Sequence, residues 1–273
     1  MNIKDLIFED VGLYDLTTLG LNISDLQGSM SFSAKDDCIV SGIKYVKEIL
    51  KELDIEYEVF IDDGLRAKKG EVILKSYSKA SSLHKAWKIS QNIVEYSSGI
   101  ATYISQMLYL AKEVNPYIEI ATTRKNFPNT KELMINAVLD GGGIVHRLGL
   151  YDSILVFQNH LNFIKKEDLQ SAFFNLKNKN IEKNVVVEVD SLENALFFAK
   201  LGADILQCEK MSIDELKKCV ELKKEFPTLK LSATGGITLD NIKEYSASGV
   251  DFIVTSSPYH AKPADIKISM EYV

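Results

Sequence analysis

The periodicity of hydrophobic and polar residues changes near Pro116 of this 273-residue chain. Before that point, short apolar or alternating segments separated by turn signals such as Asp62-Asp63-Gly64 predict antiparallel strands. A helical period predicts one amphipathic helix over residues 43–53 among them. This pattern indicates an α+β module. The expected strands cover residues 28–34, 38–40, 56–61 and 71–77.

Two further elements belong to this first part. Residues 1–23 predict a short helix followed by an extended arm. A long helical pattern begins near Ser81 and runs to about Lys112. We expect Ser97-Ser98-Gly99 to interrupt it, because the pattern is long for one helix and glycine weakens helices.

After Pro116, short apolar strands alternate with single helices. This alternation predicts parallel βα units whose strands are buried on both faces. Six strands are fewer than the eight of a closed barrel, so the sequence favours an open parallel α/β barrel, with a doubly wound sheet as the alternative. The expected strands are 118–122, 154–157, 185–189, 205–206, 229–233 and 252–255, and the expected helices are 130–139, 166–177, 192–200, 213–225 and 239–248.

The expected fold class is therefore α/β, with an N-terminal α/β sandwich over residues 1–108 and a C-terminal barrel over residues 109–259. Residues 266–273 alternate apolar and polar side chains, so they are expected to pair as a strand with the first domain. The tail over residues 260–273 is assigned to that domain for this reason.

Charge and cysteine content narrow the class of protein. The net charge of −6 disfavours a nucleic-acid binder, which normally carries a basic stripe. The three cysteines are widely spaced, which disfavours disulfides and zinc sites and favours a reducing compartment. No signal peptide or membrane-length apolar segment is visible. We therefore expect a cytoplasmic protein with no nucleic-acid or membrane partner.

Nearly every expected barrel strand ends in polar residues, although its interior is apolar. Functional side chains of α/β barrels stand at the carboxyl ends of the strands and in the loops that follow. Ordinary strand termination explains any single case, but it explains the whole set less well. The strand ends are Thr123-Arg124-Lys125, Asn159-His160, Glu188, Glu209-Lys210, Thr234-Gly235-Gly236 and Ser256-Ser257.

The segment Thr234-Gly235-Gly236-Ile237 is expected to open a helix directly after a strand. Glycines allow close approach of the backbone, and the N–H groups at a helix N-terminus attract phosphate. Ser256 and Ser257 supply further donors after the next strand, so these two loops predict a phosphate site. The alternative is a plain turn in which the glycines serve packing.

Acids and bases gather at other strand ends. Glu188 and Glu209 end successive strands and could share a Mg²⁺ ion or contact a sugar, although Glu188 could also simply pair with a lysine. Arg124 and Lys125, together with the His146-Arg147 pair that follows the glycine run 141–143, form a basic group suited to a carboxylate or phosphate. A solvated surface cluster is the alternative, especially for Lys125.

Several segments, in order along the chain, resemble the quinolinate phosphoribosyltransferase family. Within it, the Ala-Thr-Thr-Arg-Lys-x-Phe-Pro segment, Leu155-Val156-Phe157 and Ala86-Trp87-Lys88 are similar to the ModD branch of pyrophosphorylase homologues, which are associated with molybdate-transport genes. The wider resemblance rests on Phe8-Glu9-Asp10, 14–18, 98–102, 122–125 with Pro128, 141–143 with 146–150, Asn159-His160 and 234–237.

This resemblance implies a type II phosphoribosyltransferase fold, a head-to-tail homodimer or an oligomer built from such dimers, and transfer of ribose 5-phosphate from phosphoribosyl pyrophosphate with Mg²⁺. It further implies roles for individual residues. The acceptor would be bound by Thr123, Arg124, Lys125, His146, Arg147 and His160, with Lys88 entering from a partner subunit. The ribose and the metal would face Glu188 and Glu209. The 5-phosphate would be held by Thr234, Gly235, Gly236, Ser256 and Ser257.

The chain departs from the family pattern at several of these places. Phe157 stands where the family has a lysine, and Lys88 stands where it has an arginine. Both changes remove charge or bidentate geometry from the acceptor side, so a doubly charged acceptor such as quinolinate should bind less well. Val186 and Glu209 also differ from the family acids, and Thr234 and Ser256 differ in the phosphate loops.

Three functions remain open from the sequence. The first is a phosphoribosyltransferase that acts on a nitrogen heterocycle other than quinolinate, with Arg124, Lys125, Glu188 and Glu209 as its catalytic group and with a link to molybdate metabolism or transport. The second is a genuine quinolinate phosphoribosyltransferase. The third is a non-catalytic protein that binds a phosphorylated ligand or serves molybdate handling, which would have less use for paired acids.

Overall fold

The computed structural model describes residues 2–273, which form two compact units. The first unit contains the chain up to Ser105 together with Asn126–Gly142 and Pro258–Val273, and the second contains Gln106–Lys125 and Gly143–Ser257. The segment Asn126–Gly142 thus belongs by its contacts to the first unit, although it lies within the residues expected for the barrel domain.

The first unit is built on a four-stranded antiparallel sheet with the strand order β13-β1-β5-β3. Phe32 lies at its centre, paired with Ile268 on one side and Leu74 on the other. The strands are β1 (Gln27–Ala34), β3 (Glu56–Val59), β5 (Val72–Lys79) and β13 (Ile266–Tyr272), and a separate two-stranded sheet joins β2 (Cys38–Ile39) to β4 (Arg66–Ala67).

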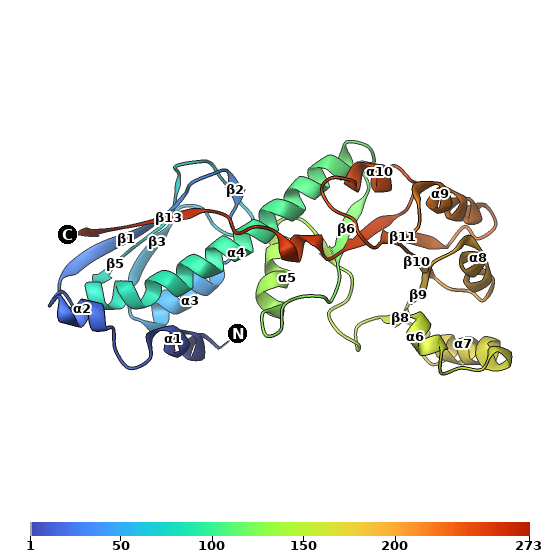
Figure 1. The fold of residues 1–273 in the computed structure, drawn as a ribbon, viewed down its shortest axis with the longest axis horizontal. Helices are drawn as coiled ribbons and strands as arrows, with labels where there is room; N and C mark the ends of the chain where they lie inside the picture. The colour runs from blue at the N-terminus through green and yellow to red at the C-terminus, as the bar shows by residue number, and fades with distance from the viewer. Residues whose placement is uncertain (1) are drawn as a thin grey trace. The chain divides into compact units, whose positions relative to one another are not determined.

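Helices pack on this sheet and complete the core of the first unit (Figure 1). The amphipathic helix α3 (Ile43–Glu52) buries its predicted apolar face there, and its first N–H groups, those of Ile43 and Lys44, donate to the Asp63 carboxylate at 2.8 and 2.9 Å. That carboxylate caps the helix in place of a local side chain. The N-terminal residues form α1 (Ile3–Val11) and α2 (Leu16–Gly20), where one helix and an extended arm were expected.

The helix α4 (Ala80–Lys112) is continuous over 33 residues, so the interruption expected at Ser97-Ser98-Gly99 is wrong. Gly99 has a packing role there. A side-chain carbon at this position would lie 2.3 Å from the carbonyl oxygen of Lys262, so only glycine lets the C-terminal segment pass this close to the helix.

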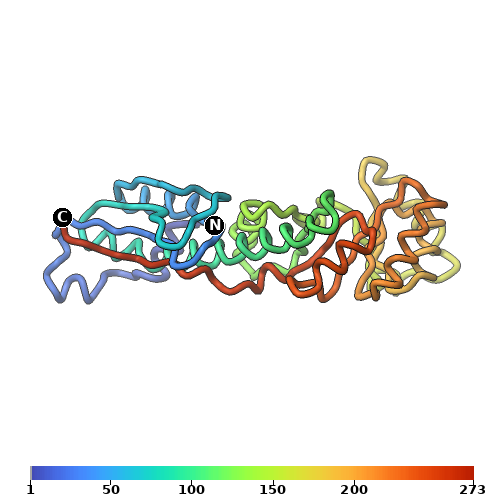
Figure 2. Tube along the Cα trace, turned by 90° about the horizontal axis from the view of Figure 1, so that it is seen from above, coloured from blue at the N-terminus to red at the C-terminus, as the bar shows by residue number. Residues whose placement is uncertain are grey.

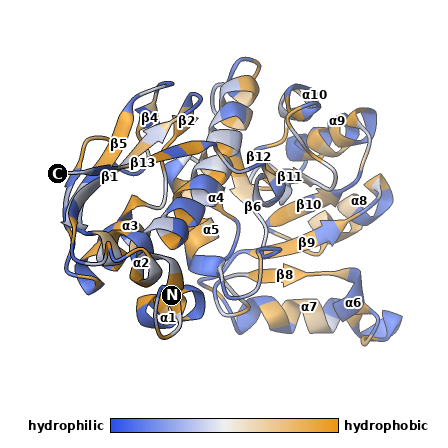
Figure 3. Cartoon of the chain, turned by 60° about the vertical axis from the view of Figure 1, so that its left-hand side comes forward, coloured by the Kyte–Doolittle hydropathy of each residue, from blue (hydrophilic) through white to orange (hydrophobic). Residues whose placement is uncertain are grey.

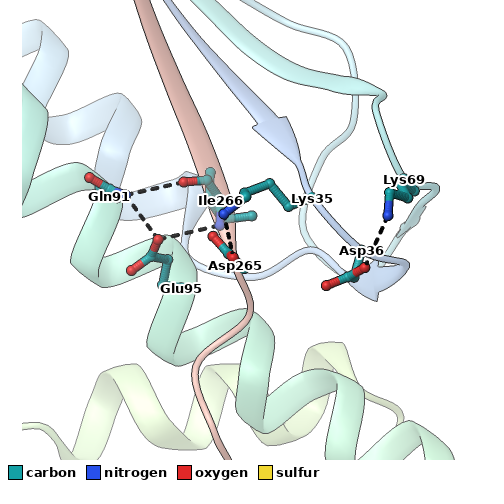
Figure 4. Close-up of polar contacts among 7 residues, drawn as sticks. All are labelled: Lys35, Asp36, Lys69, Gln91, Glu95, Asp265 and Ile266. Carbon is teal, nitrogen blue, oxygen red and sulfur yellow. Dashed lines mark hydrogen bonds and ion pairs between the residues drawn. The ribbon is translucent and has the colours of Figure 1, made fainter.

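The C-terminal strand returns to the first unit and lies along β1, as the trace in Figure 2 shows. The pairing expected for residues 266–273 is therefore confirmed. Side chains of α4 hold the start of the strand (Figure 4): Gln91 Nε2 donates to the carbonyl oxygen of Ile266 at 3.1 Å, and the Ile266 N–H donates to Glu95 at 3.3 Å. Lys35 forms an ion pair with Asp265 at 2.6 Å beside them.

The helix α5 (Lys131–Asp140) is bound to the first unit by side-chain hydrogen bonds. Ser41 Oγ donates to Asp140 at 2.6 Å, and Asn136 Nδ2 donates to the Tyr45 hydroxyl at 2.6 Å. Gly141 allows this approach, because a side chain there would collide with the Ala101 carbonyl at 2.4 Å. These contacts explain why the helix groups with the first unit.

The second unit is a seven-stranded parallel sheet in the order β7-β6-β12-β11-β10-β9-β8. Pairing of β12 with β6 continues the curl of a barrel, and only the edges β7 and β8 are not joined to each other. The open barrel is therefore confirmed, and the doubly wound alternative is wrong. The strands are β6 (Glu119–Thr122), β7 (Ile144–Val145), β8 (Ile154–Val156), β9 (Val185–Val189), β10 (Ile205–Glu209), β11 (Lys230–Thr234) and β12 (Phe252–Thr255).

The two-residue strand β7 has no counterpart among the expected strands, since two residues give no periodicity. Longer strands of this sheet are buried and hydrophobic along most of their length (Figure 3), as parallel strands covered on both faces must be. The helices of this unit are α6 (Gln158–Leu161), α7 (Leu169–Asn178), α8 (Leu192–Lys200), α9 (Ile213–Glu221) and α10 (Ile242–Ser246), with 3-10 turns at Lys166–Asp168 and Leu222–Lys224; a third turn, Ser257–His260, follows β12. None of the helices in residues 2–273 is long and apolar enough to cross a membrane.

Candidate active site

A cavity of about 370 Å³ opens at the carboxyl ends of the parallel strands in the second unit. Eight residues expected at the site line it: Thr123, Arg124, Lys125, His146, Arg147, Glu188, Glu209 and Thr234. Four others join them: Leu155, Phe157, Gln207 and Val254. The convergence of the acidic and the basic residues on one cavity is thereby confirmed, while their chemical roles stay predictions.

One wall of the cavity is acidic. Glu188 lies on β9 beside Gln207 of β10, and Gln207 Nε2 donates to Glu188 Oε2 at 3.0 Å. Glu188 and Glu209, the two acids of this wall, are both half-buried. Burial raises the pKa of the Glu188 carboxyl, and the charge of Glu209 raises it further. The Gln207 hydrogen bond and the charges of Lys125 and Lys210 act in the opposite direction and favour the ionised form.

Other strand ends supply positive charge. Arg124 and Lys125 follow β6, and the N–H of Lys125 donates to Thr123 Oγ1 at 3.2 Å. His146 and Arg147 follow β7, where the His146 N–H extends the pairing by donating to the Thr122 carbonyl at 3.1 Å. The short strand β7 therefore fixes the position of this pair.

Arg147 is 8% exposed, which is unusual for a residue of its charge. Burial lowers the pKa of its guanidinium, and the nearby charge of Arg124 adds to this effect. Burial likewise lowers the pKa of His146, with a further contribution from Arg147. Crowded, desolvated positive charge of this kind attracts an anionic ligand.

Phe157 contacts both Arg147 of this basic group and His160. The guanidinium carbon of Arg147 lies 5.7 Å from the centre of the Phe157 ring, which is the geometry of a cation–π contact. The ring of His160 stacks on the Phe157 ring with a distance of 5.8 Å between the ring centres, and His160 Nδ1 accepts a hydrogen bond from the N–H of Phe157 at 3.0 Å. His160 lines an adjacent, largely apolar cavity that shares Arg147 with the main one, and the expected substrate contact of His160 stays a prediction.

The glycine turn after β11 adopts the backbone expected for close approach. Gly235 and Gly236 both have positive φ, +92° and +73°. A side chain at Gly235 would lie 3.0 Å from Glu209 Oε1 and 3.0 Å from the backbone nitrogen of Lys210, so glycine is required for the loop after β10 to pack against this turn.

The helix that was expected to begin at this glycine turn does not begin there, because α10 (Ile242–Ser246) starts five residues after Ile237. A helix N-terminus therefore supplies no donors directly after the glycines. The loops after β11 and β12 are nevertheless joined, because Thr255 Oγ1 donates to the Ile237 carbonyl at 2.8 Å and accepts the Ser257 N–H at 3.1 Å.

Of the expected phosphate residues, Thr234 lines the cavity, whereas Gly235, Gly236, Ser256 and Ser257 are outside its lining. Lys88 lies on the exposed side of α4 in the first unit, where its Nζ donates to Gln91 Oε1 at 3.1 Å. Gln207 was not anticipated. The sequence does show that Gln207 is an amide residue next to apolar residues and that it precedes Glu209 by two positions, which places both side chains on the same face of the strand.

The acidic wall fits a divalent cation of the Mg²⁺ type. Such an ion is usually held by one or two carboxylates and keeps its other positions for water and substrate oxygens. Glu188 and Glu209 supply two carboxylates on neighbouring strands. Residues 2–273 contain no group of three or more His, Cys, Asp or Glu placed to hold a metal by themselves, so substrate oxygens would have to complete the coordination.

Comparison with known proteins decides the family. The model of the quinolinate phosphoribosyl transferase N-terminal domain matches residues 15–98, and the model of its C-terminal domain matches residues 100–269. The chain belongs to the quinolinate phosphoribosyl transferase family. The resemblance expected from the motifs is thereby confirmed.

Two relatives illustrate where the chain stands in the quinolinate phosphoribosyl transferase family. It is 35% identical to the pyrophosphorylase-like protein ModD of Pasteurella multocida over 271 residues, covering 98% of this chain and 96% of that one. It is 30% identical over 270 residues to a protein of Methanocaldococcus jannaschii that carries the name of a carboxylating nicotinate-nucleotide pyrophosphorylase, covering 96% and 93%.

The fold agrees with solved members. The nicotinate-nucleotide pyrophosphorylase of Francisella tularensis matches with a TM-score of 0.91 over 98% of this chain and 94% of that one, at 23% identity. This likeness concerns the fold. Family membership and the ModD relatives together support the expected enzyme class, a pentosyltransferase of the pyrophosphorylase type.

Proposed function

We propose that this protein transfers ribose 5-phosphate from phosphoribosyl pyrophosphate to a ring nitrogen of a heterocycle other than quinolinate. The observation that carries the proposal is the bipolar cavity, in which Glu188 and Glu209 share one space with Arg124, Lys125 and Arg147. The acids suit a sugar that becomes cationic during transfer and a cation that binds its pyrophosphate, and the basic residues suit an anionic acceptor. A protein that only bound a phosphate would have little use for the paired acids.

In the proposed reaction, the lone pair of the ring nitrogen forms a bond to the anomeric carbon of the ribose. The bond from that carbon to the pyrophosphate oxygen breaks, and the electron pair leaves with pyrophosphate. Positive charge develops on the sugar during this exchange, and the carboxylates of Glu188 and Glu209 stabilise it. A Mg²⁺ ion held by these acids and the substrate would neutralise charge on the leaving pyrophosphate.

The basic group would bind and orient the acceptor. Arg124, Lys125, His146 and Arg147 hold a carboxylate or other anionic group of the heterocycle, so that its nitrogen faces the sugar. Thr123 would add a hydroxyl, and the turn Thr234-Gly235-Gly236 with Ser256 and Ser257 would hold the 5-phosphate. Lys88 would reach this site from a second subunit of a homodimer, or of an oligomer built from such dimers.

Phe157 supports an acceptor other than quinolinate. Its ring occupies the acceptor side of the cavity and already contacts the Arg147 guanidinium. An apolar ring there offers a second carboxylate no partner, and desolvating a carboxylate without a partner is costly. We further propose that the protein works in the cytoplasm and that its acceptor is connected with molybdate metabolism, as expected from the resemblance to the ModD branch.

The test combines purified protein, phosphoribosyl pyrophosphate, Mg²⁺ and a panel of nitrogen heterocycles, and it follows pyrophosphate release. Release that depends on one heterocycle, with quinolinate inactive, is the expected result. Release of carbon dioxide with quinolinate would instead establish a genuine quinolinate phosphoribosyltransferase. Absence of turnover with every heterocycle, together with no binding of phosphoribosyl pyrophosphate by calorimetry, would leave a non-catalytic binding protein.

A further inference from the structure

Gln207 is a buried side chain whose hydrogen-bonding capacity is only partly used. It is 4% exposed and lines the cavity from β10. Its Nε2 donates to Glu188 Oε2 at 3.0 Å, whereas its Oε1 has no hydrogen-bond partner among residues 2–273. A buried acceptor without a partner is unfavourable, and such atoms in a cavity often receive a hydrogen bond from the ligand.

The Glu188 carboxylate fixes which amide atom is left for a ligand. If the amide turned over, its oxygen would lie about 3.0 Å from a carboxylate oxygen, and two acceptors would face each other. Ser232, the partner of Gln207 on β11, does not supply a donor, since its own buried hydroxyl is unpartnered among the described residues. The Gln207 carbonyl oxygen is therefore the amide atom whose hydrogen-bonding capacity is left over for a bound molecule.

The position of Gln207 along its strand indicates which part of the substrate reaches it. Gln207 precedes Glu209 by two residues on the same face of β10, so it lies deeper than Glu209 below the carboxyl end of the sheet. The sugar phosphate is assigned to the rim, where the turn at Thr234 follows its strand. Gln207 pairs with Glu188 in the register of β9 and β10, and Glu188 is assigned to the ribose. An acceptor ring whose nitrogen bonds to the anomeric carbon beside Glu188 would therefore come within reach of Gln207.

We propose that Gln207 is a specificity-determining residue whose carbonyl oxygen accepts a hydrogen bond from an N–H or O–H group of the acceptor. This inference rests on the proposed function and narrows its substrate class to nitrogen heterocycles that carry a hydrogen-bond donor. Quinolinate at neutral pH carries two carboxylates and an unprotonated ring nitrogen, so it has no donor to offer. A site built to receive a donor discriminates strongly against an analogue that lacks one.

The test compares heterocycles in matched pairs in which one member carries the donor and the other lacks it. Suitable probes are imidazole-carboxylate against its N-methyl derivative, and amino-substituted pyridine-carboxylates against the same rings without the amino group. Binding of each probe is measured by calorimetry in the absence of phosphoribosyl pyrophosphate. We expect the wild-type protein to bind the donor-bearing member of a pair about 10-fold more tightly, the size of one well-made hydrogen bond in a buried site.

Two variants separate this interaction from a structural role. Gln207→Met keeps the length of the side chain and removes the acceptor, so the preference within each pair should fall to about one. Ser232→Ala is the matched control, because it removes a buried, unpartnered hydroxyl in the same layer without touching the cavity lining. It should leave the preference unchanged. Thermal unfolding of both variants verifies that they fold.

Each result bears on the inference. Equal binding of both members by the wild-type protein, a preference retained in Gln207→Met, or no binding of any probe would overturn it. A raised KM for phosphoribosyl pyrophosphate in Gln207→Met, with the preference intact, would assign Gln207 to the sugar half and also overturn it. Failure of the proposed function is distinguishable, since it would abolish pyrophosphate release while the preference in binding without phosphoribosyl pyrophosphate could persist.

Discussion

The guanidinium of Arg147 lies over the ring of Phe157, with its central carbon 5.7 Å from the ring centre. This contact gives the acceptor side of the cavity an apolar surface next to a buried positive charge. It occurs at the position where other members of the family are expected to carry a lysine.

Replacing Phe157 with lysine should shift the protein toward dicarboxylate acceptors. A second cation beside Arg147 would pair with a second carboxylate, so Phe157→Lys should bind quinolinate roughly 10-fold more tightly, the scale of one hydrogen bond to a charged group. The variant should also melt at a lower temperature, because two cations would share a partly buried space. Calorimetry with quinolinate measures the first effect, and Phe157→Leu serves as the uncharged control. Equal affinities of the two variants would contradict the assignment of Phe157 to the acceptor side.

Neutralising the acidic wall should impair the handling of the sugar diphosphate. We expect Glu209→Gln and Glu188→Gln each to lower kcat/KM by roughly 10-fold to 100-fold, since each loses an ionic partner for the developing sugar cation or its metal. Steady-state kinetics at varied Mg²⁺ measures this. Glu193→Gln, an exposed acid in the first turn of α8, is the control and should behave as wild type. Unchanged kinetics in both wall variants would remove the carboxylates from the mechanism.

The two glycines after β11 make different demands on the fold. Gly235→Ala combines strain from a φ of +92° with contacts at 3.0 Å to Glu209 Oε1 and to the Lys210 backbone. Gly236→Ala has φ at +73° and no atom within 4 Å, so it isolates the strain alone. We expect losses of about 1–2 kcal/mol for Gly236→Ala and a larger loss for Gly235→Ala. Chemical denaturation measures both free energies of unfolding. Equal losses would show that the packing against the β10 loop contributes nothing.

Sequence reasoning identified the barrel because its strands are mostly apolar and carry polar residues at or near their carboxyl ends, as Glu188 does in Val185–Val189. It placed eight cavity residues correctly for the same reason: parallel strands bring all their carboxyl ends to one edge. It missed β7, whose two residues show no period, and it missed Gln207, whose importance depends on an unpaired atom that only coordinates reveal.

The misassigned helix break at Gly99 has a similar cause. Glycine has a low intrinsic helix propensity, which led to the expected break. In the structure, the absence of a side chain at Gly99 allows close contact with the carbonyl of the distant Lys262. The stacking of the Phe157 ring on His160, which places His160 outside the lining of the main cavity, was likewise not expected, and the substrate contact of His160 stays a prediction. Tertiary contacts of this kind leave no trace in sequence periodicity.

Replacing Gly99 should therefore destabilise the protein despite improving helix propensity. Gly99→Ala gains roughly 1 kcal/mol of intrinsic helix propensity, but its new carbon would lie 2.3 Å from the Lys262 carbonyl oxygen. We expect a net loss of about 1–3 kcal/mol in the free energy of unfolding. Gly20→Ala, at a helical glycine with no atom within 4 Å, is the control and should not destabilise the protein. Net stabilisation of Gly99→Ala would refute the close-approach explanation.

His146 should make stability depend on pH. Burial and Arg147 lower its pKa below the ordinary value of 6.5, so the folded state binds its proton more weakly than the unfolded state does. The stabilising contribution of neutral His146 is complete above about pH 6.5 and is lost as the pH falls toward the lowered pKa of the folded state. Urea unfolding of wild type and His146→Gln from about pH 7.5 to about pH 5.5 measures this. The variant should show the flatter profile, and exposed His260→Gln should match wild type. A His146→Gln profile as steep as that of wild type would disprove the burial argument.

The pairing of β13 with β1 has a consequence for synthesis on the ribosome. One edge of β1, from Gly28 to Ala34, stays without its partner until residues 266–272 have been translated, which is after every strand of the barrel has emerged. During that interval the nascent chain exposes an unpaired strand edge, which is the feature most prone to wrong association between chains. The first unit to be translated is therefore the last to be completed, and loss of a few C-terminal residues would damage the beginning of the protein more than its middle.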